Sequence, residues 1–108
     1  MELRRDPFHA IADPTRRQII GMLAQKPQNV NSLAEQFDMS RQAISLHVKI
    51  LNECGIITIN QIGRERICHA KLEKLEEVSA WVSQYKEFWT ERFAALEKHL
   101  ETIKSKSK

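Results

Sequence analysis

Apolar residues recur every three or four positions through the first half of this sequence, a pattern that indicates helices with one buried face. Four helices are expected, over residues 5–12, 14–25, 31–37 and 40–53. Asp13, Asn31 and Ser40 carry the short polar side chains that cap helix N-termini, and they are expected to start the second, third and fourth helices. Residues 26–29 are expected to interrupt the helical structure between the second and third helices.

The pattern changes after Gly55, which supplies the left-handed residue that ends a helix and lets Ile56 fold back on Leu51. Two runs rich in β-branched residues, 56–59 and 66–69, flank a turn at Gly63 and predict a β-hairpin. The order helix, short turn, helix, hairpin is that of a winged helix-turn-helix. We therefore expect a mainly α single domain, residues 1–108, with a small β-hairpin wing and a core unit over 5–70.

The C-terminal third has its own apolar stripe, over residues 72–103, with no glycine or proline to interrupt it. It is expected to form one helix or two, followed by a flexible basic tail at 104–108. The stripe could be buried within the subunit, form a small-molecule pocket or form a dimer seam. The seam is favoured because the small preceding region cannot cover so many aromatic residues. The expected seam residues are Val82, Tyr85, Trp89, Phe93, Leu96 and Leu100.

Composition limits the partners of the chain. The 108 residues carry a net charge of +3, and a surplus of positive charge lies in residues 40–69. This balance is mildly favourable for nucleic acid. Neither a leader segment nor a membrane-spanning run is recognisable, so a cytoplasmic protein without a membrane partner is expected. Cys54 and Cys68 lack a CxxC spacing and are expected to be reduced, as buried inert thiols rather than as a redox switch.

The helix over 40–53 has two chemically different faces. At 100° per residue, one face gathers apolar residues with His47, which is expected to be a hydrogen-bonded structural residue. The opposite face offers an amide, hydroxyl groups and cations, which are the groups that read base edges and hold phosphates. On that face Leu46 either contacts a thymine methyl group or packs on a neighbouring element. With the arginines of the wing tip, residues 61–66, the expected DNA-binding set is Ser40, Arg41, Gln42, Ser45, Leu46, Lys49, Arg64 and Arg66.

Arg16 and Arg17 lie in the first turn of the second helix, where a cation opposes the helix dipole. Such a position implies a partner for each side chain. An intramolecular salt bridge is favoured over a phosphate contact, because structural ion pairs are common at such positions.

The segments that carry these features resemble the ArsR family of winged-helix repressors over residues 5–100. They are Asp13-Pro14-Thr15-Arg16-Arg17, Asn31-Ser32-Leu33-Ala34, Ser40 to Leu51 and Gly55-Ile56-Ile57. The segments around Trp81-Val82 and 88–93 look like the metal-independent branch with a long C-terminal helix. The resemblance implies a homodimer, joined also through Phe8 and Ile11, that binds double-stranded DNA at a palindromic operator and represses by blocking the promoter.

Family members that sense metals through thiolates carry a Cys-x-Cys pair where this chain has Asn29 and Asn31, with Ala34 at the position of a further cysteine. His99 is the only histidine in 72–103, whereas a tetrahedral zinc site on paired helices needs a second one. No metal and no cofactor is therefore expected, and any small-molecule effector is left open. Phosphate loops, nucleophile elbows and paired carboxylates are not recognisable, so no enzyme is expected. The alternative function is a winged-helix protein-interaction module, an antirepressor or assembly factor.

Overall fold

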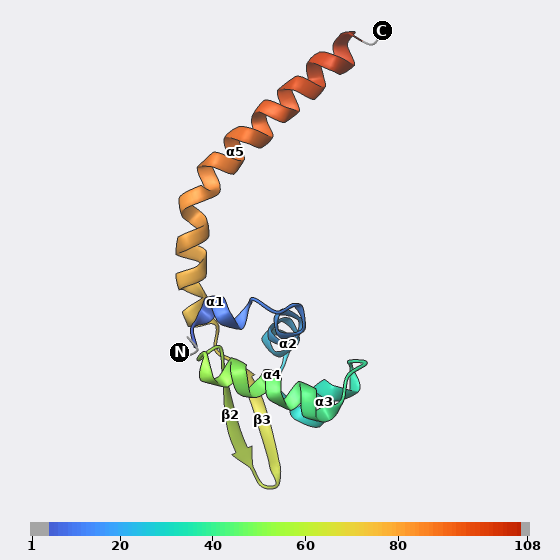
Figure 1. Ribbon diagram of the computed structural model, residues 1–108, viewed down its shortest axis with the longest axis vertical. Coiled ribbons are helices and arrows are strands. Elements are labelled where there is room, and N and C mark those ends of the chain that lie inside the picture. Colours follow the sequence, from blue (N-terminus) through green and yellow to red (C-terminus); the bar gives the residue numbers. More distant parts are fainter. Residues whose placement is uncertain (1–4, 107–108) are drawn as a thin grey trace. The chain divides into compact units, whose positions relative to one another are not determined.

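The computed structural model describes residues 5–106 of the chain, and it divides into two compact units, Met1–Val78 and Ser79–Lys108 (Figure 1). The chain is mostly helical and carries one small three-stranded antiparallel sheet. The predicted fold class, a mainly α winged helix-turn-helix, is confirmed. None of the described helices combines the length and the apolar character needed to span a membrane.

The first unit begins with two helices, each with proline in its first turn. Helix α1 (Pro7–Ala10) is shorter than the expected 5–12, and Asp6 caps it by accepting a hydrogen bond from the His9 N–H. Helix α2 (Pro14–Gln25) has the predicted bounds, and the Asp13 carboxylate accepts from the Arg16 N–H at 3.1 Å. Proline suits both places because the first N–H groups of a helix have no intrahelical acceptor.

Helices α3 (Val30–Glu35) and α4 (Arg41–Glu53) form the helix-turn-helix. The cap predicted at Asn31 is wrong: Asn29 caps α3, accepting from the Ser32 N–H at 2.7 Å, and Asn31 lies within the first turn. Both asparagines have the chemistry of a cap, and the place where the preceding strand ends decides between them. The cap predicted for α4 is confirmed, because the Ser40 hydroxyl accepts from the Ala43 N–H.

The end of α4 has the predicted geometry. Gly55 adopts a φ of +78°, the left-handed conformation that favours glycine. The Ile56 N–H donates to the Leu51 carbonyl and the Gly55 N–H donates to the Asn52 carbonyl, both at 3.1 Å. These two bonds define a Schellman ending, which turns the chain directly into the sheet.

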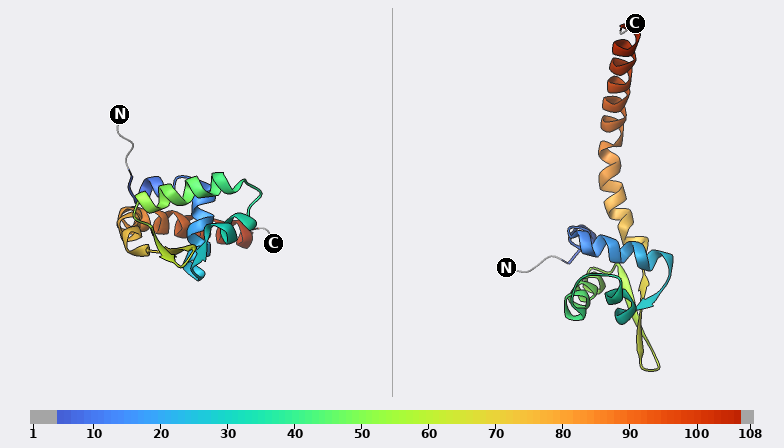
Figure 2. Two further views of the ribbon diagram at one scale, coloured as in Figure 1. Left: turned by 90° about the horizontal axis from the view of Figure 1, so that it is seen from below. Right: turned by 90° about the vertical axis from the view of Figure 1, so that its right-hand side faces the viewer.

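The sheet has the strand order β1-β3-β2, from β1 (Gln28–Asn29), β2 (Ile57–Ile62) and β3 (Glu65–Ala70). The hairpin is confirmed, with strands longer than predicted, and Gly63 at φ +62° opens its two-residue turn. In Figure 1 and in the right-hand view of Figure 2, that turn lies on the side of α4 that faces away from α1 and α2. Strand β1 was not predicted, because the segment reads as a breaker until it pairs with β3.

One apolar core joins the elements of this unit, and the helix face and the sheet face both contribute to it. Its largest fully buried side chains are Ile19, Leu33, Ile44, Leu51, Cys54, Ile56, Ile57 and Cys68. Burial raises the pKa of the Cys54 and Cys68 thiols, although nearby arginine charges oppose the shift. Both cysteines are free and buried, so the structure favours inert thiols over a redox switch.

The C-terminal stripe forms one helix rather than two. A 3₁₀ turn (Leu72–Lys74) leads directly into α5 (Leu75–Lys106), which continues past the expected end at residue 103. Residues 107–108 of the expected tail lie outside the described residues. The second unit is the part of α5 from Ser79 onward, and its aromatic residues are exposed.

Candidate nucleic-acid interface

The predicted division of α4 into two faces is confirmed. Ile44 and Leu51 are completely buried, and Val48 is nearly so, because this face packs on α2, α3 and β2. The opposite face is exposed, and Leu46 on that face keeps 58% of its surface accessible. Packing of Leu46 inside the subunit, one of its two interpretations, is therefore not seen.

The outer face of α4 and the wing line one open hollow of about 590 Å³. Its lining residues are Val30, Arg41, Gln42, Ser45, Leu46, Val48, Lys49, Asn52, Ile59 and Arg66. Of the predicted DNA-binding residues, only Ser40 and Arg64 lie outside it. Ser40 caps the same helix, and Arg64 joins Arg41, Ser45 and Arg66 around an adjoining hollow of about 200 Å³. The structure thus brings the helix residues and the wing residues to one surface.

Side chains at the start of α3 hold this surface together. The Arg41 Nε donates to the Asn31 Oδ1, which ties the first turn of α4 to α3. The Asn29 Nδ2 donates to the Glu65 Oε1 at 3.5 Å and so links the cap of α3 to the wing. Sequence reasoning missed these roles, because each contact joins side chains from different elements, and no local pattern signals such a contact.

Asn52 was also missed, although the sequence carried a signal for it. It follows Gln42, Ser45 and Lys49 at the three- and four-residue steps of one helix face, and it lines the same hollow. Its side chain is exposed. Extending the outer face by one more turn would have included it.

The electrostatics of this surface suit a polyanion. The first turn of α4 contains no acidic residue, and the helix dipole adds partial positive charge there. Arg41, Lys49, Arg64 and Arg66 are exposed, and Glu65 is the acidic residue in the lining of the two hollows. Over residues 5–106, no group of three or more His, Cys, Asp or Glu side chains is arranged to hold a metal ion.

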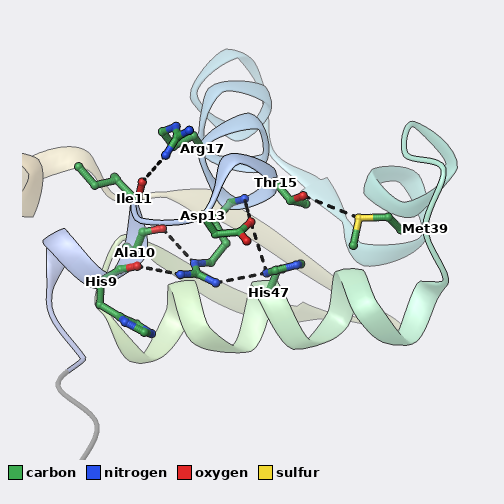
Figure 3. Close-up of polar contacts among 9 residues, drawn as sticks. His9, Ala10, Ile11, Asp13, Thr15, Arg17, Met39 and His47 are labelled. Carbon is green, nitrogen blue, oxygen red and sulfur yellow. Dashed lines mark hydrogen bonds and ion pairs between the residues drawn. The ribbon is translucent and has the colours of Figure 1, made fainter.

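On the side of α4 opposite its outer face, the buried Arg16 takes part in a polar cluster. Its partners His9, Ala10 and His47 are labelled in Figure 3. Only 7% of its surface is exposed, and its guanidinium donates to the His9 carbonyl at 2.8 Å and to the Ala10 carbonyl at 3.0 Å. Arg17 donates to the Ile11 carbonyl at 2.7 Å. The expectation of intramolecular partners is correct, but the expected carboxylate is wrong. The partners are carbonyls at the negative end of α1.

His47 belongs to the same cluster, as a structural residue. Its Nδ1 lies 3.4 Å from an Arg16 Nη1 and 4.0 Å from an Asp13 carboxylate oxygen. Partial burial raises the pKa of the Asp13 carboxyl. The hydrogen bonds from the Arg16 and Thr15 N–H groups and the nearby positive charge outweigh that effect, so this pKa lies below its ordinary value. Asp13 is therefore a carboxylate at neutral pH.

The comparisons with known proteins agree with this geometry. The model of the family described as "Bacterial regulatory protein, arsR family" matches residues 13–58, from the cap of α2 into β2. A solved ArsR family transcriptional regulator, RHA00566, is 37% identical, with a TM-score of 0.68, and the match covers 77% of this chain and 86% of that one. The chain belongs to the ArsR family. An ArsR-like transcriptional regulator from Rhodococcus sp. RHA1 is 32% identical, with a TM-score of 0.68. That match covers 88% of this chain and 87% of the other.

A curated relative is the transcriptional repressor SdpR of Bacillus subtilis (strain 168). It is 37% identical over 57 residues, which are 53% of this chain and 63% of the repressor. The chain thus spans somewhat less than two thirds of that relative. ArsR-family transcriptional regulators are non-enzymatic DNA-binding proteins, so the expectation that this chain is not an enzyme is confirmed.

Proposed function

We propose that this ArsR-family chain is a homodimeric transcriptional repressor that binds a palindromic operator. Helix α4 enters the major groove, and the wing contacts the adjoining backbone and minor groove. The observation that carries the proposal is the convergence of the outer face of α4 and the wing arginines on one open, cationic surface. A repressor of this kind acts in the cytoplasm, and the proposal includes that location.

Each exposed group has a role that its chemistry suggests. The Gln42 amide can donate to and accept from adenine, and the Lys49 ammonium can donate to guanine. Leu46, exposed in the free chain, can contact a thymine methyl group, and Ser45 can bond to either kind of base edge. Ser40, Arg41 and the N-terminus of α4 suit phosphates, and Arg64 and Arg66 suit the backbone or minor groove.

The dimer is supported by the uncovered apolar stripe of α5. Its residues are about half exposed, and Phe93 keeps 65% of its surface accessible. They recur at three- and four-residue steps, the spacing of a coiled-coil seam, with an extra step of four between Trp89 and Phe93. We assign this surface to a second copy of the chain, in the set Val82, Tyr85, Trp89, Phe93, Leu96 and Leu100. Phe8 of α1 and Ile11, the residue that follows α1, are both partly buried and are proposed to join the interface.

The proposal is tested by fluorescence anisotropy with duplexes enriched from a random pool, measured over a series of salt concentrations. Affinity should fall steeply with salt, because bound phosphates release counterions. Gln42→Ala should relax base preference at one position. Arg64→Ala should weaken all duplexes alike and reduce the salt slope by about one. Equal effects of the two variants on every sequence would contradict the assignment.

The exposed aromatic stripe also fits the alternative, a protein-interaction module. Wild-type protein that binds no duplex at low salt would favour that alternative over repression. In that case the stripe, rather than α4, would be the functional surface of the chain.

A further inference from the structure

Arg16 of α2 joins α1 and α4 to its own helix through its guanidinium. Its partners His9, Ala10 and His47 are labelled in Figure 3. Its Nε and one Nη bind the carbonyls that end α1, and its other Nη faces the Nδ1 of His47 on α4. Among the described residues, Arg16 is the one charged residue whose side chain is buried. A buried cation is costly unless its donors are satisfied, so this arrangement needs all three partners in place.

A second contact joins Arg5, just before the cap of α1, to the C-terminal end of α4. The Arg5 Nε donates to the Glu53 carboxylate at 2.7 Å, and an Arg5 Nη lies 2.8 Å from the His9 Nε2. His9 thus connects both contacts, through its ring to Arg5 and through its carbonyl to Arg16. The segment around α1 is therefore attached to α4 both near its middle and at its C-terminal end.

These polar contacts supply something that the apolar core does not. Contacts of Ile44 and Leu51 with their neighbours are non-directional. A hydrogen bond is directional and weakens steeply when its angle changes. The contact at His47 is therefore sensitive to the rotation of α4 about its axis, and so to the direction in which the outer face points.

We propose that Arg16 is a positioning residue for the recognition helix: it holds α4 to α1 through neutral His47, and so sets the presentation of the DNA-binding face. This inference rests on the proposed function of α4 in DNA binding. It adds a route from α1, which carries Phe8 of the proposed dimer surface, to the operator. Neither Arg16 nor His47 needs to touch the nucleic acid.

The contact depends on the protonation state of His47. Arginine has no acceptor, so the Nδ1 that faces Arg16 must be unprotonated, with the ring proton on Nε2. A protonated ring would present an N–H to a donor, and the Asp13 carboxylate at 4.0 Å would be its alternative partner. Among the elements packed on α4, β2 has no ionisable residue and Glu35 of α3 is exposed. Asp13, at the cap of α2, and Arg16 of α2 are the groups that face the ring of His47, and the guanidinium of Arg16 also donates to the His9 carbonyl.

Arg17→Lys is a matched control for Arg16→Lys. Arg17 also binds a carbonyl at the end of α1, but its side chain is exposed and its described contact is with Ile11, not with α4. In the full-length protein, Arg16→Lys should shift the backbone amide resonances of residues 44–49, and Arg17→Lys should leave them unchanged. Nitrogen resonances of the His47 ring should show the proton on Nε2 at neutral pH. Equal amide shifts in both variants, or a proton on Nδ1, would overturn the inference.

Binding to a selected duplex gives the functional test. Arg16→Lys and His47→Ala should each weaken binding about tenfold, and the double variant should lose no more than either single one. His47→Asn places an amide oxygen near the position of Nδ1, so it should restore the binding that His47→Ala loses.

The outcomes separate the two proposals. Additive losses in the double variant, or wild-type affinity of folded Arg16→Lys, would overturn the positioning role while DNA binding stands. Wild-type protein that binds no duplex would overturn the proposed function. If the α4 resonances in that protein still respond to Arg16→Lys and not to Arg17→Lys, the positioning role is supported all the same.

Discussion

The two units of this chain use the same sequence pattern with opposite results. In the winged helix, apolar residues spaced by three and four, such as Ile44 and Leu51, are completely buried by neighbouring elements. In α5, residues with the same spacing are half exposed, and Trp89 keeps 54% of its surface accessible. Periodicity thus tells which side of a helix is apolar, and it does not tell what covers that side.

The difference indicates where each unit obtains its stability. The first unit buries its apolar face within one chain, supported by caps, a Schellman ending and the sheet. The exposed stripe of α5 has no such cover among the described residues. Most helices in proteins are stabilised by packing of an amphipathic face, so the α5 stripe calls for an external partner.

The largest effect is expected from two leucines on opposite faces of α4. Leu51→Ala should lower the free energy of unfolding by about 2–5 kcal/mol, because it leaves a cavity in the core. Leu46→Ala should change it by less than about 0.5 kcal/mol, because Leu46 is exposed. Chemical denaturation of both variants measures the difference, and similar losses would show that α4 is oriented otherwise.

A change in the α5 stripe should act on association instead. Trp89→Ala should weaken the dimer by about 2 kcal/mol or more, as expected for a central aromatic residue of an interface. Sedimentation equilibrium measures the dissociation constant. Glu91→Ala, an exposed charge change on the same helix, is the control and should leave the constant nearly unchanged. A monomeric wild-type protein would remove the basis of this prediction.

Substitution of the two asparagines at the start of α3 should also have different effects, one mainly on stability and the other mainly on DNA binding. Asn29→Ala removes the cap and should lower the free energy of unfolding by about 1 kcal/mol. Asn31→Ala should cost less stability but should weaken duplex binding, because it frees Arg41. Thermal unfolding and anisotropy measure the two effects. The reverse order of stability losses would place the cap at Asn31 after all.

The smallest effect concerns Asp13, whose charge stabilises the start of α2. Because its pKa is lowered in the folded state, its contribution is present above the ordinary carboxyl pKa and is lost as pH falls through the lowered value. Asp13→Asn keeps the cap and removes the charge, so it should flatten the acid side of the stability curve slightly. Denaturant midpoints at several pH values measure this. An unchanged acid slope would mean that the charge contributes nothing.

Local patterns predicted much of this molecule. The bounds of α2, the cap at Ser40, the ending at Gly55 and the two faces of α4 all depend on residues close in sequence, and all are confirmed. The predicted DNA-binding residues also meet on one surface, because periodicity fixes a helix face and the wing follows it directly.

The features that were missed depend on contacts distant in sequence. Strand β1 exists only through its pairing with β3, and that pairing moves the cap of α3 from Asn31 to Asn29. The carbonyl partners of Arg16 come from the end of α1, which no charge pattern reveals. The sequence left open whether residues 72–103 form one helix or two, because the apolar stripe is the same in both cases. The structure has one long helix, α5, after a short 3₁₀ turn.

Selection of bound duplexes from a random pool tests the central claim most directly, because it reports the sequence and the spacing of the contacted bases together. The account predicts two inverted half-sites whose centres lie about 10 base pairs, or one helical turn, apart, or a multiple of that spacing. Recovery of a single isolated half-site, or no enrichment at all, would contradict a dimer that places two copies of α4 in successive major grooves.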